Sequence, residues 1–284
     1  MSTKNQALTS PCPCDTLSKA VNSPTPFPEL NAVLDDLVTS VQAVLGENFV
    51  AAYLHGSFAL GGFDSHSDAD FLVAIQHEVS ESQLAALQAM HGRIYDRESE
   101  WARHLEGSYF LLATLRRYDP DSELLWYLDN TVRELIRSNH CNEWVVRWIV
   151  LDCGIVLAGP PPDELIEPVP RDEMRGQILA TMRYWADMLF SDPEQMNNRW
   201  YQPFAVLTYC RMLQTLRTGT VMSKLAAARW AQCELDTRWS GLIQGAWEQR
   251  PNPSLKVHQK ADPDDLDQTL EFIRYALAEG GRYG

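Results

Sequence analysis

The chain has 284 residues, of which 45% are hydrophobic and 10% aromatic, and this composition is typical of a globular protein with an ample core. Its formal net charge of −14 argues against broad nucleic-acid binding, which requires a basic surface. No apolar run approaches the length of a membrane span, and the N-terminus has no apolar signal core, so we expect neither a membrane partner nor secretion.

The six cysteines form no zinc-type double pair. Cys12 and Cys14 lie near the N-terminus, and the other four lie in apolar helical contexts that are typical of reduced core thiols. The adjacent His140 and Cys141 lack a second ligand pair, so we interpret them as a helix start and not as a metal site. A cytoplasmic location is therefore expected.

Residues 1–26 are rich in Ser, Thr, Pro, Asn and Lys, which predicts a flexible leader. Apolar residues then recur at helical spacing, with a proline at the start and Gly46 at the end, so we expect a helix over residues 28–45. Two apolar runs rich in β-formers follow, over residues 49–54 and 71–75, and both are of strand length.

The polar stretch between these two strands is the most informative part of the sequence. Gly56 and Ser57 predict a sharp turn where backbone can approach a ligand closely. A short helix expected over residues 57–61 would direct its N-terminal amides at an anion.

Asp68 and Asp70 flank one alanine at the start of the second strand, so their carboxylates point to the same side. Two carboxylates on one face repel each other unless a cation lies between them, and hard oxygen ligands favour Mg²⁺. A solvated acidic turn is the alternative. The glycine-serine turn upstream favours a site for a nucleoside triphosphate with a metal ion.

The order of Gly56 and Ser57, a glycine pair, and then Ser67, Asp68 and Asp70 resembles the nucleotidyltransferase signature of the DNA polymerase β-like superfamily. More closely, it resembles the aminoglycoside adenylyltransferases that modify streptomycin and spectinomycin. The resemblance implies ATP as co-substrate and two Mg²⁺ ions held by the aspartates. It also implies that the glycine and the two serines donate hydrogen bonds to the phosphates.

A helix is expected over residues 84–100, behind a capping box of Ser80 and Gln83, and a third strand over residues 105–115. A neighbouring strand would bring Glu106 beside the aspartates, where it could bind the metals or take a proton from a hydroxyl. From the residues alone, a salt-bridged glutamate at a strand end is equally compatible. The resemblance implies that Glu106 is the general base and lies at the metals.

Trp126 lies beside carboxylates in an aromatic stretch and could form a platform for a sugar or aminocyclitol. The resemblance implies a substrate-contacting tryptophan in about this place, although packing in the core explains Trp126 equally well. Asn142 is expected to cap the helix that begins at Trp144.

Gly159 and the three prolines after it predict a domain boundary. We expect an α/β nucleotidyltransferase domain with a mixed sheet over residues 27–158 and an all-α helical bundle over residues 159–284. The segment at residues 157–170 resembles the lead into the helical domain of the same family. Apolar spacing predicts helices over residues 171–190, 201–217, 222–234, 236–249 and 264–279.

The resemblance implies that Arg211 and Lys224 contact the triphosphate, since charge-assisted hydrogen bonds suit a highly anionic group. Exposed helix cations are the alternative. Tyr201 lies where the family sets part of its substrate specificity, and we expect Tyr201 to contact the substrate. The acidic residue that the family has there is absent. The resemblance therefore supports the nucleotidyl-transfer reaction better than it supports a particular antibiotic as substrate.

The sequence therefore predicts a monomeric, ATP- and Mg²⁺-dependent enzyme that transfers AMP to a hydroxyl of a polycationic aminoglycoside or aminocyclitol and releases pyrophosphate. The negative net charge would attract such a substrate, although a need for solubility explains the same net charge. Two alternatives stay open. The acceptor could be another small molecule or a protein, or the chain could be a nucleotide sensor without transfer activity.

Overall fold

A computed structural model describes residues 23–64, 67–122, 124–250 and 258–283, so most of the expected leader lies outside the described residues. The strands are β1 (Phe49–Leu54), β2 (Ala69–Ile75), β3 (Leu105–Leu111), β4 (Leu125–Leu128), β5 (Leu135–Ser138) and β6 (Ile155–Ala158). They form one sheet in the order β5-β4-β3-β2-β1-β6. Only β2 and β3 pair in parallel, so this is the mixed sheet that the sequence predicts.

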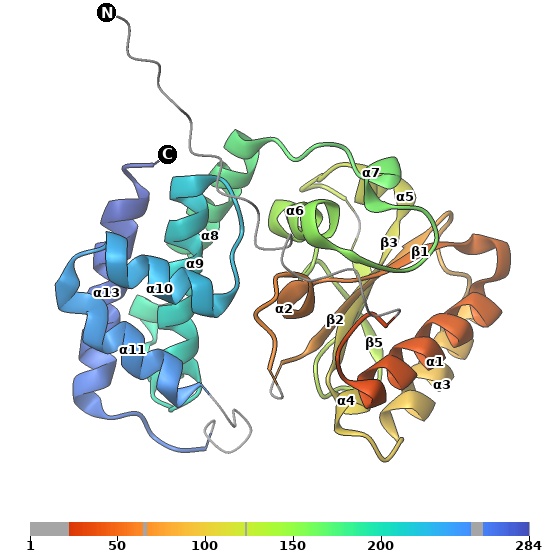
Figure 1. Cartoon of the computed structure of the whole chain (residues 1–284), viewed down its shortest axis with the longest axis horizontal. Coiled ribbons are helices and arrows are strands. Elements are labelled where there is room, and N and C mark those ends of the chain that lie inside the picture. Colours follow the sequence, from red (N-terminus) through yellow and green to blue (C-terminus); the bar gives the residue numbers. More distant parts are fainter. Residues whose placement is uncertain (1–22, 65–66, 123, 251–257, 284) are drawn as a thin grey trace, which may run out of the picture.

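Helices cover both faces of this sheet (Figure 1). One face packs against α1 (Pro28–Leu45) and α3 (Glu81–Tyr95), with α4 (Glu100–Arg103) at their end. The other face packs against α5 (Leu112–Arg116), α6 (Trp144–Cys153) and α7 (Pro162–Leu165). The short helix α2 (Gly56–Ala59) joins β1 to β2. Side chains alternate along each strand, so consecutive residues of β2 point to different helical layers.

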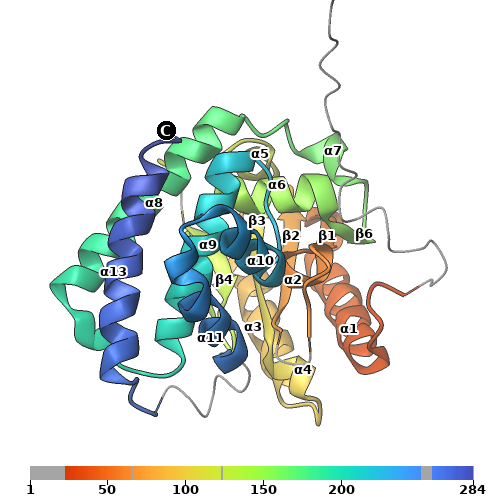
Figure 2. The same cartoon turned by 60° about the vertical axis from the view of Figure 1, so that its left-hand side comes forward.

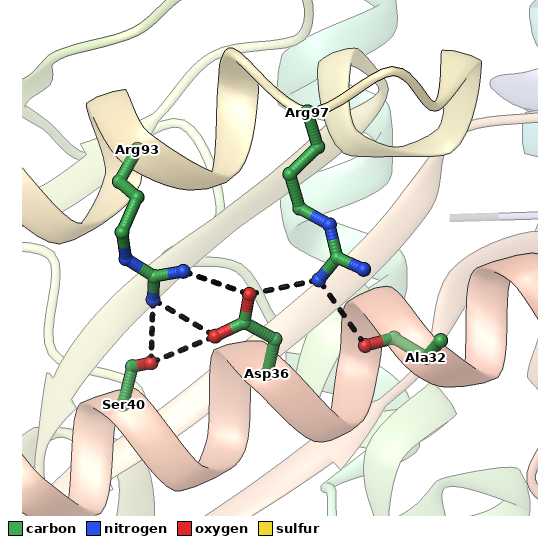
Figure 3. A network of polar contacts seen from close by, with 5 residues as sticks. All are labelled: Ala32, Asp36, Ser40, Arg93 and Arg97. Carbon is green, nitrogen blue, oxygen red and sulfur yellow. Dashed lines mark hydrogen bonds and ion pairs between the residues drawn. The ribbon is translucent and has the colours of Figure 1, made fainter.

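A polar network fixes α1 to α3 (Figure 3). Asp36 of α1 accepts hydrogen bonds from Arg93 Nη2 at 2.8 Å and from Arg97 Nη1 at 2.8 Å. Arg93 also donates to Ser40 Oγ at 2.7 Å. These bonds hold the pKa of Asp36 at about 2, chiefly because Arg93 stabilises the carboxylate.

The C-terminal region is helical, with α8 (Arg171–Ser191), α9 (Tyr201–Thr218), α10 (Lys224–Glu234), α11 (Ser240–Gln249) and α13 (Pro263–Gly280). Helix α9 lies at its centre, since it contacts α8, α10, α11 and α13. Short 3₁₀ helices lie at η2 (Gly46–Asn48), η3 (Pro193–Met196) and η4 (Thr237–Trp239). Ala59 of α2 and Trp144 of α6 join the core of this region, so the sheet and the helices share packing.

Several expectations about element boundaries need correction. Helix α3 has the expected capping box but ends at Tyr95, and a separate short helix begins at Glu100. Strand β3 ends at Leu111 and turns directly into α5. The N-cap of α6 is Glu143 and not Asn142, whose Oδ1 accepts a hydrogen bond from the buried Arg147 at 2.7 Å. The strands β4, β5 and β6 are each four residues long, too short for a clear pattern.

The residues after β6 still pack against the sheet, since Leu165 and Ile166 belong to the core beneath its strands. The boundary at 158/159 stays a prediction, and we propose that Leu165 and Ile166 belong structurally to the domain of the sheet.

Two further expectations concern the cysteines and the membrane. Cys141 and Cys210 are buried free thiols and Cys153 is partly buried, but Cys233 is exposed, contrary to its expected place in the core. Cys12 and Cys14 lie outside the described residues. Within the described ranges, no helix has the length and apolar character needed to cross a lipid bilayer.

Candidate active site

Two neighbouring strands bring the predicted carboxylates together. Asp70 of β2 lies opposite Glu106 of the parallel strand β3, and neighbouring strands lie about 4.8 Å apart. Burial, and after it the neighbouring Asp68, raise the pKa of Asp70 to about 6. Burial and then Asp70 raise the pKa of Glu106 to about 7. Because these groups repel each other, the cluster favours a cation.

The turn after β1 packs closely against the side chain of Asp70. Gly56 has φ +58°, and a Cβ there would collide with the Asp70 carboxylate, so only glycine fits. The backbone N–H of Ser57 donates to that carboxylate and lowers its pKa. Ser57 Oγ is buried and has no hydrogen-bond partner among the described residues. This hydroxyl is therefore available to a ligand at the turn.

The rest of this loop contacts the helical region, and Figure 2 shows α2 beside α10. A Cβ at Gly62 would collide with Ser223, the N-cap of α10. Ser67 is buried, and its hydroxyl accepts a hydrogen bond from the N–H of Asp64 at 2.9 Å. Asp64 also forms an ion pair with Arg250, which follows α11. The loop is thus held between sheet and helices.

Arg211 of α9 and Lys224 at the start of α10 lie close enough to Asp70 to stabilise its carboxylate, and both therefore lower the pKa of Asp70. Burial lowers the pKa of Lys224, and Arg211 lowers it further, while the nearby carboxylates counteract this. Burial also lowers the pKa of Arg211, which Asp70 and Glu143 oppose. The site therefore has an acidic wall on the sheet and a basic wall on the helices.

Two groups contact the Glu106 carboxylate directly. Tyr127 Oη donates to Glu106 Oε1 at 2.8 Å and lies 3.0 Å from Asp129 Oδ1. His140 Nε2 lies 3.6 Å from Glu106 Oε1. A phenol has one proton, so both Tyr127 contacts are hydrogen bonds only when one carboxyl is protonated. With a pKa raised to about 7, Glu106 can carry that proton near neutral pH; it then donates to Tyr127 Oη, and Tyr127 donates to Asp129. Such a pKa suits a group that accepts and returns protons.

The structure separates the two expected substrate contacts. Trp126 pairs with Tyr109 across β3 and β4 and packs into the core beneath α1 and α3. It therefore points away from Glu106, which favours the alternative of core packing, and a substrate contact of Trp126 stays a prediction. Tyr201 begins α9, and its ring packs against Trp200 at 5.6 Å and Phe204 at 5.9 Å between centroids.

The aromatic group next to Tyr201 borders the basic wall. The ammonium of Lys224 lies 5.5 Å from the centre of the Phe204 ring, and Phe204 stacks on Trp200 at 5.1 Å. Tyr201 thus lies at the edge of the site, on the side of the helices.

Sequence reasoning missed five polar residues that contact the site. Tyr127 and His140 contact Glu106, Asn130 and His104 contact Asp68, and Glu143 faces Arg211. For Tyr127 the signal is its neighbour, since consecutive strand residues point to opposite faces of the sheet, and Trp126 on the α1/α3 face therefore puts Tyr127 on the face of Glu106. The others lie in turns, where sequence periodicity gives no signal.

The oxygen ligands present fit part of a Mg²⁺ site. Among the described residues, no three His, Cys, Asp or Glu side chains are close enough to hold a metal ion by themselves. Mg²⁺ is commonly held by one or two carboxylates together with substrate phosphates. The paired carboxylates of Asp68 and Asp70, beside the unpartnered Ser57 hydroxyl, match that arrangement with a nucleotide as the remaining ligand.

Two family models match the chain in order. Residues 41–122 match the nucleotidyltransferase domain, and residues 164–279 match the aminoglycoside adenylyltransferase C-terminal domain. The chain is 24% identical over 260 residues to the aminoglycoside (3'') (9) adenylyltransferase of Shigella flexneri, covering 88% of this chain and 95% of that protein. It is 26% identical to the spectinomycin 9-adenylyltransferase of Staphylococcus aureus, covering 67% and 74%.

Among solved structures, the fold is similar to that of the spectinomycin adenyltransferase from Enterococcus faecialis, solved with ATP and spectinomycin. The TM-score is 0.65 at 14% identity, covering 87% of this chain and 98% of that one. The fold and the two matched models define a nucleotidyltransferase with a helical C-terminal domain. Over most of its length the chain is similar to the aminoglycoside adenylyltransferases.

Proposed function

We propose that this protein transfers AMP from ATP to a hydroxyl of an aminoglycoside or aminocyclitol antibiotic of the streptomycin or spectinomycin type. The observation that carries this proposal is the pairing of Asp70 with Glu106 on adjacent strands, opposite Arg211 and Lys224 of the helical region. The substrate class rests on the relatives, two of which are named for spectinomycin.

In the proposed reaction Glu106 takes the proton of the acceptor hydroxyl, and its raised pKa suits a base that works near neutral pH. The acceptor oxygen attacks the α-phosphorus of ATP in line, and the bond between this phosphorus and the bridging oxygen to the β-phosphorus breaks. Arg211 and Lys224 stabilise the negative charge that develops on pyrophosphate. The proton on Glu106 returns to solvent before the next turnover.

Asp68 and Asp70 are the proposed ligands of Mg²⁺, which when bound offsets their repulsion and polarises the phosphate oxygens. Gly56 and Ser57 would place backbone and hydroxyl donors at the phosphates, and the Ser57 hydroxyl has the freedom to do so. Ser67 Oγ accepts from the Asp64 N–H at 2.9 Å and donates to Asp64 Oδ1 at 3.4 Å, so its proposed phosphate contact would replace the second of these bonds.

The acceptor would lie at Glu106, next to the turn after β4 and the aromatic group at the start of α9. Asp129 contributes a carboxylate there, which suits an ammonium group of a polycationic acceptor. Tyr201 is the proposed aromatic contact on the helical side. A monomeric state, a cytoplasmic location and the lack of a nucleic-acid partner stay predictions.

The test is an incubation of the protein with Mg-ATP and single antibiotics: spectinomycin, streptomycin and an aminoglycoside without a streptamine-type ring. Mass spectrometry would detect an adenylyl adduct, and a coupled assay would detect pyrophosphate. Glu106→Gln is the chemical control. Glu100→Gln is the matched control, because Glu100 is a strongly exposed glutamate outside the site.

An adduct on spectinomycin or streptomycin that Glu106→Gln abolishes and Glu100→Gln leaves intact supports the proposal. ATP binding without an adduct on any antibiotic overturns the antibiotic assignment and leaves another small molecule or a protein as acceptor. ATP binding without pyrophosphate release for any acceptor overturns transfer and favours the nucleotide sensor.

A further inference from the structure

The turn after β4 contacts Asp68 through one side chain. Asn130 Nδ2 donates to Asp68 Oδ1 at 2.6 Å, although the two residues are far apart in sequence. Asp68 precedes β2, and its side chain is 39% exposed, so packing alone does not fix the direction of its carboxylate. A short, charge-assisted hydrogen bond is the strongest orienting contact available to such a group.

A second side chain holds Asn130 in place. His104 Nδ1 lies 3.0 Å from Asn130 Oδ1 and 3.7 Å from Asp68 Oδ1. A carboxylate only accepts hydrogen bonds, so the amide nitrogen of Asn130 must face Asp68, and the amide oxygen must face His104. His104 Nδ1 therefore carries a hydrogen, and His104, Asn130 and Asp68 form a chain of donors and acceptors with one consistent direction.

Backbone hydrogen bonds fix the three segments that carry this chain. Ala69 N–H donates to the carbonyl oxygen of His104 at 2.8 Å, and Thr131 N–H donates to that of Arg103 at 3.0 Å. Thr131 has φ +64°, an uncommon conformation for a residue other than glycine. Such strain persists where the surroundings impose it, and here it accompanies the turn that directs Asn130 at Asp68.

We propose that Asn130, held by His104, is a positioning residue that aims the Asp68 carboxylate at the metal of the nucleotide complex. This inference rests on the proposed Mg²⁺–ATP site and adds residues to it. Outer hydrogen bonds to metal ligands typically change metal affinity by about 10- to 100-fold when removed. We expect the affinity of the nucleotide-loaded protein for metal to fall by about tenfold in Asn130→Ala.

The experiment measures metal binding without catalysis. Electron paramagnetic resonance would follow the binding of Mn²⁺, a paramagnetic substitute for Mg²⁺, to the full chain with a non-transferable ATP analogue that has a methylene bridge between the α- and β-phosphorus atoms. Steady-state activity over a series of Mg²⁺ concentrations would complement it. In Asn130→Ala the Mg²⁺ concentration for half-maximal activity should rise about tenfold, while kcat at saturating Mg²⁺ changes little and Tm stays the same.

Two further variants and a control complete the test. His104→Ala should weaken Mn²⁺ binding severalfold, and His104→Gln should restore most of it, because a glutamine amide can still donate to Asn130. Gln244→Ala is the matched control, since Gln244 Nε2 donates to the Glu248 carboxylate at 2.7 Å on the exposed face of α11, outside the site. It should bind Mn²⁺ as the wild type does.

The outcomes separate this inference from the proposed function. If the wild type fails to bind Mn²⁺ with the nucleotide, the metal site itself is wrong. If the wild type binds and a folded Asn130→Ala binds within twofold of it, the positioning role is overturned. Should Asn130→Ala fail to fold, the His104 pair decides the matter: equal binding by His104→Ala and His104→Gln would overturn the role, and rescue by glutamine would support it.

Discussion

Asp36 and Asp70 carry the same carboxylate in opposite surroundings. Arg93 and Arg97 surround Asp36, and the pKa of this residue is lowered to about 2, chiefly by the hydrogen bond from Arg93. The pKa of Asp70 is raised to about 6, chiefly by burial and then by Asp68, and its cations only partly compensate. The fold itself supplies cations that neutralise the Asp36 carboxylate. The negative charge around Asp70 is only partly neutralised by the fold, and a bound cation can neutralise the rest.

The sign of each shift predicts opposite effects on stability. A carboxylate whose folded pKa is lowered stabilises the fold above its unfolded pKa, whereas one whose folded pKa is raised destabilises the fold once it ionises. At neutral pH Asp36 therefore contributes to folding, and Asp70 opposes it. Active sites commonly reduce stability in this way, because function needs charges that folding disfavours.

Asp70→Asn should give the largest effect and test the comparison directly. Activity should fall by about a thousandfold or more, because a metal-binding carboxylate is lost, while Asn still accepts the Ser57 N–H. Stability should rise by about 1–3 kcal/mol above pH 6, where wild-type Asp70 ionises against its surroundings, and the gain should vanish below about pH 4. Denaturant unfolding at several pH values measures the change in stability, and steady-state rates on the same samples measure the change in activity. A variant that loses activity and stability together would contradict our interpretation.

Glu106→Gln should lower kcat by about a hundredfold to a thousandfold, since a general base is removed. In the wild type, kcat/KM for ATP should rise with pH through about 7, because Glu106 must lose its proton, and it should fall about tenfold per pH unit below that value. The residual activity of the variant should lack this rise. An identical pH dependence in both proteins would assign the titration to another group.

Lys224→Met should lower kcat/KM for ATP by about tenfold to a hundredfold, because a charge-assisted contact with the phosphates contributes about 1.5–3 kcal/mol. Arg229→Met on the same helix is the matched control, since Arg229 is exposed. Steady-state kinetics at saturating acceptor measures both. Equal losses in the two variants would show that general surface charge, and not the basic wall, attracts the nucleotide.

The sequence was sufficient for most of the long elements and for the pair of aspartates at the start of β2. Helix α1 and strand β1 have the predicted bounds, because their apolar periodicity is long and Gly46 ends the helix between them. The spacing of Asp68 and Asp70 predicted two carboxylates on one side, whereas the residues alone left the place of Glu106 open and the resemblance put it at the site. The roles of Arg211 and Lys224 came from resemblance alone, since nothing in a helical pattern indicates which cation faces another part of the molecule.

The remaining site residues depend on strand register and turn geometry. Tyr127 reaches Glu106 only because β4 pairs with β3 in one register, and that same register turns Trp126 to the opposite face. Asn130 reaches Asp68 through a turn with a positive φ at Thr131. Four-residue strands and strained turns have no periodicity, so the sequence could not predict these contacts.

Asp36→Asn should give the smallest effect, a loss of about 1 kcal/mol, because Asp36 is partly exposed and such pairs contribute little in water. Its folded pKa is lowered, so the stability that it contributes is present above about pH 4 and is lost as pH falls towards 2. Urea unfolding in steps from pH 7 to pH 3 should therefore show a constant gap to the wild type that narrows below pH 4, with unchanged activity. Asp172→Asn is the control, since its side chain is 99% exposed near Arg175. A gap as wide at pH 3 as at pH 7 would mean that the network in Figure 3 acts through packing, and the contrast between Asp36 and Asp70 would no longer be one of charge.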